Sequence, residues 1–85
     1  MDHIQELLEG IIKAMVSIPD EVLIEKEIDE KGVRFSIWVD KRDMGLVVGS
    51  RGVNIEAIKQ IFGILGQREK TNISIKLKEP KNYVN

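Results

Sequence analysis

The turn Gly49-Ser50-Arg51-Gly52 separates two apolar segments, and it is the feature that most limits how this chain can fold. Glycine has no Cβ, so such a turn adopts backbone conformations that other residues avoid and can lie unusually close to another group. Val47-Val48 precedes the turn, and Ile55 and Ile58 follow it at helical spacing. A helix that begins at Val53 would present free N–H groups and its positive dipole end at the turn, which favours an anion.

The first half of the chain reads as one helix followed by two strands. Apolar residues recur at helical spacing from Ile4 to Met15, and Pro19 prevents this helix from continuing. Residues 21–28 and 33–39 alternate as strands do, and the short loop between them predicts an antiparallel hairpin. The register sets Ile28 opposite Val33, Ile24 opposite Ile37 and Val22 opposite Val39 toward the helices, with Glu27 opposite Arg34, Glu25 opposite Ser36 and Leu23 opposite Trp38 on the other face.

The second half reads as two helices and a final strand around the glycine turn. Asp43 is the predicted N-cap of a short helix over residues 44–48. The helix after the turn should end between Gly66 and Glu69, and the alternating strand over residues 73–78 is stopped by Pro80. The long helix is expected to bury Ile55, Ile58, Ile61, Phe62 and Leu65.

Composition excludes several classes of protein. The chain has 85 residues, enough for one small domain, and no cysteine for disulfides or thiolate metal sites. One histidine, His3, can build neither a zinc site nor a catalytic triad, and no carboxylate pair reads as general acid and base. No apolar run approaches the length of a membrane span, and the first residues lack the basic region followed by an apolar core that is typical of a secretory leader. We therefore expect a cytoplasmic, non-catalytic protein with no cofactor, metal or small-molecule substrate.

Charge is distributed unevenly along the chain. The net charge is −1, but residues 1–30 hold nine acidic and two basic side chains, whereas residues 31–85 hold eleven basic and five acidic ones. The basic part contains the glycine turn, so the polarity of the chain favours an anionic partner there.

The order strand, short helix, G-x-x-G, helix and strand over residues 33–77 resembles the K-homology (KH) domain. The helix and strand before it resemble the bacterial, type II arrangement, and the whole chain is similar to small stand-alone bacterial KH proteins. The resemblance implies an α+β fold of order α-β-β-α-α-β, with a three-stranded sheet packed against three helices. The chain length allows a single domain, which we place over residues 1–79, and residues 80–85 read as a flexible tail because they carry no structural signal.

The resemblance implies that single-stranded RNA binds in a groove beside the turn, where the turn backbone packs against the sugar-phosphate chain. Gly49 and Gly52 would permit close approach, Ser50 would donate a hydrogen bond, and Arg51 would supply charge. We expect Met44, Val47 and Ile55 to be partly exposed toward a base and Ile58 to belong mostly to the core. The other candidate RNA contacts are Val48, Lys41, Arg42, Arg68, Lys70 and Lys76, with Lys78 beside them. The groove has no aromatic platform, so binding should be weak, with modest base preference.

The resemblance suggests an RNA chaperone or post-transcriptional regulator that forms a homodimer or a heterodimer with another KH-containing protein. Trp38 and Leu23 are the predicted contact, although Trp38 lying over neighbouring side-chain stems explains it equally well. The alternative is a protein–protein adaptor with an idle groove, which an acid near the phosphate path, Glu56, favours. A nucleotide-binding role is least favoured, because the turn lacks the lysine and Ser/Thr of a P-loop.

Overall fold

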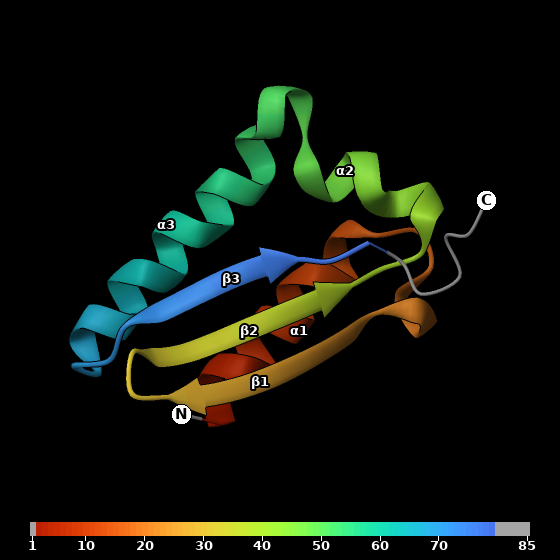
Figure 1. Ribbon diagram of the computed structural model, residues 1–85. Helices are drawn as coiled ribbons and strands as arrows, with labels where there is room; N and C mark the ends of the chain where they lie inside the picture. Colours follow the sequence, from red (N-terminus) through yellow and green to blue (C-terminus); the bar gives the residue numbers. More distant parts are fainter. Residues whose placement is uncertain (1, 80–85) are drawn as a thin grey trace.

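Strand β2 (Gly32–Trp38) lies at the centre of a three-stranded sheet in the computed structural model, which describes residues 2–79. Strand β1 (Leu23–Asp29) pairs with it antiparallel on one side, and strand β3 (Ile73–Leu77) pairs with it parallel on the other (Figure 1). The helices are α1 (Asp2–Met15), α2 (Met44–Val48) and α3 (Val53–Arg68), so the predicted order α-β-β-α-α-β is confirmed. The predicted tail over residues 80–85 lies outside the described residues.

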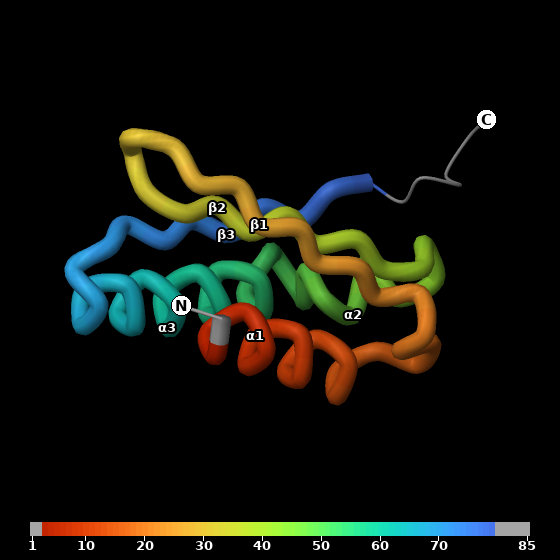
Figure 2. The backbone as a smooth tube through the Cα atoms, turned by 90° about the horizontal axis from the view of Figure 1, so that it is seen from below, coloured from red at the N-terminus to blue at the C-terminus, as the bar shows by residue number. Residues whose placement is uncertain are grey.

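The hairpin register follows the prediction. Ile24 pairs with Ile37 and Ile28 with Val33, and the pairing of Asp29 with Gly32 leaves a two-residue turn. Val22 and Val39 lie one residue beyond the ladder. Ile28, predicted to face the helices, is instead 68% exposed, because the hairpin end curves away from the helical layer (Figure 2).

All three helices cover one face of the sheet (Figure 2). The core lies between the two layers, and its fully buried members come from every layer: Leu8 and Ile12 on α1, Phe35 and Ile37 on β2, Val47 on α2 and Phe62 on α3. On the opposite face of the sheet Leu23 is 41% exposed and Trp38 is half-buried. The sheet therefore has one packed face and one largely open face.

The predicted burial of one α3 residue, Ile61, is wrong. Ile55, Ile58 and Phe62 are buried, but Ile61 is 51% exposed. Successive helical residues are rotated by about 100°, so Ile61 cannot share the face that Phe62 presents to the sheet. Ile61 was predicted to be buried because it is apolar, but its position around the helix turns it away from the sheet.

Helix α3 ends at Arg68, within the predicted interval, in a Schellman motif. The N–H of Thr71 donates to the carbonyl oxygen of Gly66 at 2.8 Å, and the N–H of Lys70 donates to that of Gln67 at 3.1 Å. Lys70 takes the left-handed conformation, with φ 56°, at the position that glycine usually holds. A side chain with a Cβ is strained there.

Replacing Lys70 with glycine should stabilise the domain. Glycine adopts the left-handed conformation without strain, and the gain exceeds its larger entropy loss on folding by about 0.5–1 kcal/mol. Urea unfolding monitored by circular dichroism measures the difference. Lys70→Ala retains the Cβ and serves as the control, so equal stability of the glycine and alanine variants would contradict the assignment of strain.

Candidate nucleic-acid interface

The turn between α2 and α3 depends on backbone conformations that glycine favours. Gly49 has φ 79° and ψ 170°, and Gly52 has φ 78° and ψ 15°. Between them Arg51 is also left-handed, with φ 58° and ψ 24°. The conformation of Gly49 is accessible essentially to glycine alone, whereas that of Arg51 is strained but open to other residues.

The two glycines serve different purposes. A Cβ on Gly49 would lie 2.6 Å from Cγ of Asn54 and 2.8 Å from its backbone nitrogen. The side chain of Asn54 fills that space, and its Nδ2 donates to the carbonyl oxygen of Leu46 at 2.8 Å. A Cβ on Gly52 would meet nothing within 4 Å. Close approach from outside is therefore open at Gly52, while the space at Gly49 is used to join α2 to α3.

Asn54 is a residue of this site that sequence reasoning missed. It occupies the second position of α3 and bridges back to the last turn of α2 through the bond to Leu46. The available signal was its position two residues after the second glycine, where a short amide side chain can reach the preceding turn.

Ser50 and Arg51 are exposed, as the prediction of an accessible turn requires. No side chain among the described residues caps the first turn of α3, whose N-cap residue is Gly52. The exposed guanidinium of Arg51 thus lies beside the positive end of a 16-residue helix. Glu56, the acid near this end, forms an ion pair with Lys59 at 3.6 Å. Arg51 is therefore the charged side chain of the turn, and the nearest acid, Glu56, is paired with Lys59.

The expected groove walls are only partly correct. Met44 and Val48 are half-buried, but Val47 is fully buried and Ile55 is 9% exposed, so the expected partial exposure of these two residues is wrong. Both point into the space between the helices and the sheet, as Ile58 does. The exposed apolar side chains around the turn are instead Leu46, at 50%, and Val53, at 59%. The helical phase predicts this exposure, because Leu46 is next to a residue that faces the core and Val53 is next to the turn.

The structure separates the candidate cations into three places. Lys41 and Arg42 are exposed just before α2, and Arg42 is bound to Asp40. Arg68 and Lys70 lie at the far end of α3, about 22 Å along the helix from the turn at 1.5 Å per residue. Lys76 alternates with the buried Ile73 and Ile75 and so belongs to the sheet face away from the helices. Arg51 and Lys41 are the predicted cations that remain close to α2 and the turn without a carboxylate partner among the described contacts.

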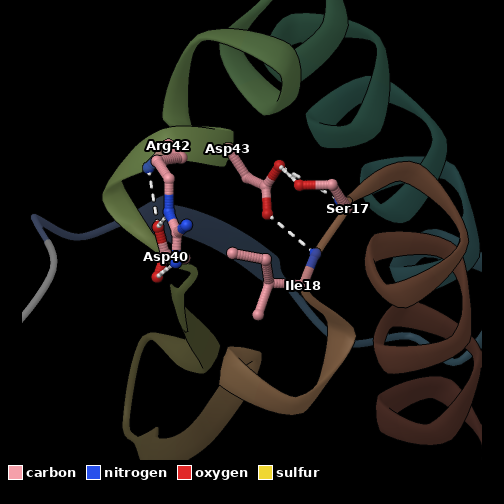
Figure 3. A network of polar contacts seen from close by, with 5 residues as sticks. All are labelled: Ser17, Ile18, Asp40, Arg42 and Asp43. Carbon is pink, nitrogen blue, oxygen red and sulfur yellow. Dashed lines mark hydrogen bonds and ion pairs between the residues drawn. The ribbon is translucent and has the colours of Figure 1, made fainter.

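Two aspartates, Asp40 and Asp43, lie on the segment before α2 (Figure 3). Asp40 Oδ1 accepts from the backbone N–H of Arg42 at 2.8 Å and from its Nε at 2.9 Å. The bond from the Arg42 side chain is the main reason why the pKa of Asp40 lies below its ordinary range. Asp40 therefore caps this segment.

Asp43 is the N-cap residue of α2, as predicted, but its side chain makes no capping bond to the helix. Its buried carboxylate turns toward the end of α1 instead and accepts from the backbone N–H of Ser17 at 3.1 Å, from the Ser17 hydroxyl at 2.8 Å and from the N–H of Ile18 at 3.1 Å (Figure 3). The bond from the Ser17 N–H is the largest cause that lowers the pKa of Asp43, and burial opposes it. Asp43 thus ties α2 to the chain that leaves α1.

Two hollows lie at the hairpin end of the sheet, with volumes of about 140 and 410 Å³. Asp29 accompanies Lys31 in the lining of both, so their charges are mixed. The described residues include no group of three His, Cys, Asp or Glu side chains placed to hold a metal ion. None of the helices in residues 2–79 has the length and apolar character to span a bilayer.

A β1-β2-β3 sheet, covered on one face by three helices with a G-x-x-G turn between the last two, is a type II KH domain. The chain can also be assigned to one family within this class of domain. The chain belongs to the family described as "KhpA/KhpB, KH domain", whose model matches residues 5–77.

Curated relatives cover nearly the whole chain. The RNA-binding protein KhpA of Thermotoga maritima is 35% identical over 73 residues, which cover 84% of this chain and 96% of the relative. The RNA-binding protein KhpA of Streptococcus pneumoniae is 32% identical over 76 residues, 88% of this chain and 96% of the relative. That of Listeria monocytogenes is 29% identical over 75 residues, 88% of this chain and 99% of the relative.

The carboxylate of Asp43 should make the stability of the domain depend on pH. Its pKa is lower in the folded state than in the unfolded chain, so its contribution is present above about pH 4 and is lost as the pH falls through the folded value. Asp43→Asn places an amide NH₂ against N–H donors, so it should lower the melting temperature at pH 7 and flatten the decline below pH 4.

Thermal melts between pH 2 and 7 test this prediction. Asp20→Asn makes the same substitution at an exposed carboxylate in the segment after α1, so it is the control and should change the melting temperature less. If Asp43→Asn melts like the parent protein at pH 7, the hydrogen bonds to Ser17 and Ile18 do not stabilise the fold.

Proposed function

We propose that this protein binds single-stranded RNA at the G-x-x-G turn without catalysing a reaction. The observation that carries the proposal is the open space at Gly52, beside the exposed Arg51 and the uncapped N-terminus of α3. A phosphate that approaches there meets a cation and the positive end of a helix, with no Cβ to keep it away. The names of the curated relatives, RNA-binding protein KhpA, support RNA as the ligand.

A single strand suits this site better than a duplex. The exposed apolar side chains around the turn, Leu46 and Val53, can contact the face or edge of an unpaired base, which a duplex keeps stacked. The cations near the turn are few, so phosphate contacts should be few and affinity modest. Base preference should also be modest, because neither apolar side chain hydrogen-bonds to a base edge.

The adaptor alternative draws less support from the site. Its main argument was the acidic charge of Glu56 near the phosphate path, and Lys59 pairs with that carboxylate at 3.6 Å. The pair leaves Arg51 as the charge that a ligand meets at the turn. An RNA chaperone or post-transcriptional regulator in the cytoplasm, acting as a homodimer or with a second KH-containing chain, is the cellular role that we propose.

Changing both Ser50 and Arg51 to Asp should reduce RNA affinity roughly tenfold or more, since the loss of one charge-assisted hydrogen bond already has that effect. Two acids repel phosphate, while Asp tolerates the left-handed conformation of Arg51, so the fold should persist. Fluorescence anisotropy with a labelled single-stranded RNA measures the affinity, and circular dichroism verifies folding.

The matched control carries the same change of charge elsewhere. Lys13→Glu with Ala14→Glu alters the exposed side of α1 and should bind RNA nearly as well as the parent protein. If both double variants lose affinity equally, net charge and not the turn governs binding. If the Asp variant binds as tightly as the parent, the site assignment is wrong.

The salt dependence of binding should identify the phosphate contacts. Arg51→Gly keeps the left-handed backbone but removes the charge, so the slope of log affinity against log salt should fall by about 0.7, and Lys41→Ala should act similarly if Lys41 contacts phosphate. Titrations from about 50 to 200 mM salt measure this slope. A duplex of the same sequence should bind more weakly, and equal affinity for both forms would rule out a single-strand groove.

A further inference from the structure

Trp38 lies at the carboxyl end of β2, on the face of the sheet that the helices leave open (Figure 2). It is half-buried, and its cross-strand partner Leu23 is 41% exposed. Tryptophan is enriched at binding surfaces because its ring offers a large apolar area with a polar edge. The pair is therefore an apolar spot on a face that otherwise carries polar and charged side chains.

Two lysines flank Trp38 on this face. Lys76 of β3 alternates with Ile75 and Leu77, which belong to the helix side of the sheet. Lys78 follows the strand, and its N–H donates to the carbonyl oxygen of Ile37 at 2.9 Å, so it lies next to Trp38 across the sheet. Neither lysine has a carboxylate partner among the contacts of the described residues.

The acids of the open face lie on the side of β2 away from these lysines. Glu25 and Glu27 belong to β1, and Arg34 binds Glu27 at 3.2 Å. The row across the sheet that contains Trp38 has Leu23 on one side and a lysine on the other, so its neighbours in that row carry no acid. Positive charge on this face is therefore concentrated along β3, beside the tryptophan.

We propose that Trp38, Lys76 and Lys78 form a second contact for single-stranded RNA, in which the indole ring stacks on a base and the two amines contact phosphates. Stacking needs only the flat face of a base, so it tolerates any sequence but requires an unpaired strand. The two lysines are about 7 Å apart along the strand, a spacing similar to that of successive phosphates in an extended chain. The proposal rests on the RNA binding proposed above and supplies the aromatic contact that residues 41–58 around the turn lack.

The second contact lies on the opposite face of the sheet from the G-x-x-G turn, but at the same end of the molecule. The carboxyl ends of β2 and β3 are directed toward the part that holds α2 (Figure 1). Because β3 is an edge strand, an RNA that leaves the turn can pass around its outer edge to Lys76 and then to Trp38. Only an RNA long enough to pass this edge can occupy both places.

A protein partner fits the open face less well. Leu23 and Trp38 are its apolar residues, and they share the face with Glu25 and Glu27. Burying these acids against a second protein surface is costly unless each finds a partner. An RNA strand that follows β3 leaves the acids of β1 in water.

The fluorescence of Trp38 tests the contact directly, because the chain has a single tryptophan. An oligouridylate of about four nucleotides, the length that a G-x-x-G loop clamps, is compared with one about three times as long. The long RNA should quench the fluorescence at saturation, and the short one should leave it nearly unchanged. Anisotropy of labelled forms of both RNAs measures binding independently.

The two readouts separate this proposal from that of RNA binding at the turn. Anisotropy that shows binding of the long RNA without quenching would overturn the second contact and leave the turn site intact. Absence of any binding in anisotropy would overturn both proposals. Equal quenching by the short and the long RNA would also overturn the second contact, because the signal would then come from binding at the turn.

Trp38→Leu should lower the affinity for the long RNA roughly tenfold, a loss within the range of one base–aromatic stack, and leave the affinity for the short RNA unchanged. Trp38→Phe keeps an aromatic ring and should retain most of the affinity. Circular dichroism verifies that both variants fold. An equal loss for both RNAs, or the same loss in Trp38→Phe as in Trp38→Leu, would show that Trp38 does not act by stacking.

Salt titrations with the long RNA test the two amines. Lys76→Ala and Lys78→Ala should each lower the slope of log affinity against log salt by about 0.7, the value for one phosphate contact with a single strand. Lys31→Ala removes an exposed lysine at the hairpin end of the sheet, so it is the matched control and should keep the slope of the parent. Unchanged slopes in both Lys76→Ala and Lys78→Ala would overturn the proposed contact.

Discussion

The backbone of the turn from Gly49 to Gly52 is the constraint on which the arrangement of the helices depends. Three of its four residues have positive φ, and this path brings Asn54 back against the carbonyl of Leu46. A Cβ at Gly49 would displace Asn54 and open the contact between α2 and α3. The first glycine is therefore required by the packing of the protein itself, and only the second leaves space that a ligand can enter. The G-x-x-G turn thus contains one glycine that the packing requires, Gly49, and one that a ligand can approach, Gly52.

The fold could be predicted from the sequence because its signals are local and periodic. Alternation in β1 and β2 determined the register, since a slip of one residue would have turned Ile24 and Ile37 away from the helices. The predictions failed where contacts between residues far apart in the sequence determine the partner of a side chain. Asp43 has the residue type and position of a cap, yet its carboxylate accepts from the N–H groups of Ser17 and Ile18, which are 26 and 25 residues away. No local pattern reveals that partner.

The candidate site was predicted less completely than the fold, because charge along a chain does not determine charge in space. The basic second half of the sequence suggested a basic groove, but folding sends Lys76 to the far face of the sheet and Arg68 to the far end of α3. The predicted exposure of Val47 and Ile55 was wrong for a related reason, since each helical step of about 100° turns neighbouring side chains toward different surroundings. Which side chains near the turn are exposed depends on how each helix is rotated against the sheet.

Helix α3 unites the separate properties of the molecule, because different parts of it have different surroundings. Its inner face holds Phe62 in the core, its N-terminus lies at the turn beside Arg51, and its outer face is apolar. A surface helix with no demand on its outer face would carry charged residues there, which keep a small domain soluble. On α3 the exposed charges are Glu56, Lys59 and Arg68, whereas Val53, Ile61 and Ile64 are more than half exposed beside them. Residues of different helical phase thus let one helix hold the core, border the turn and meet solvent.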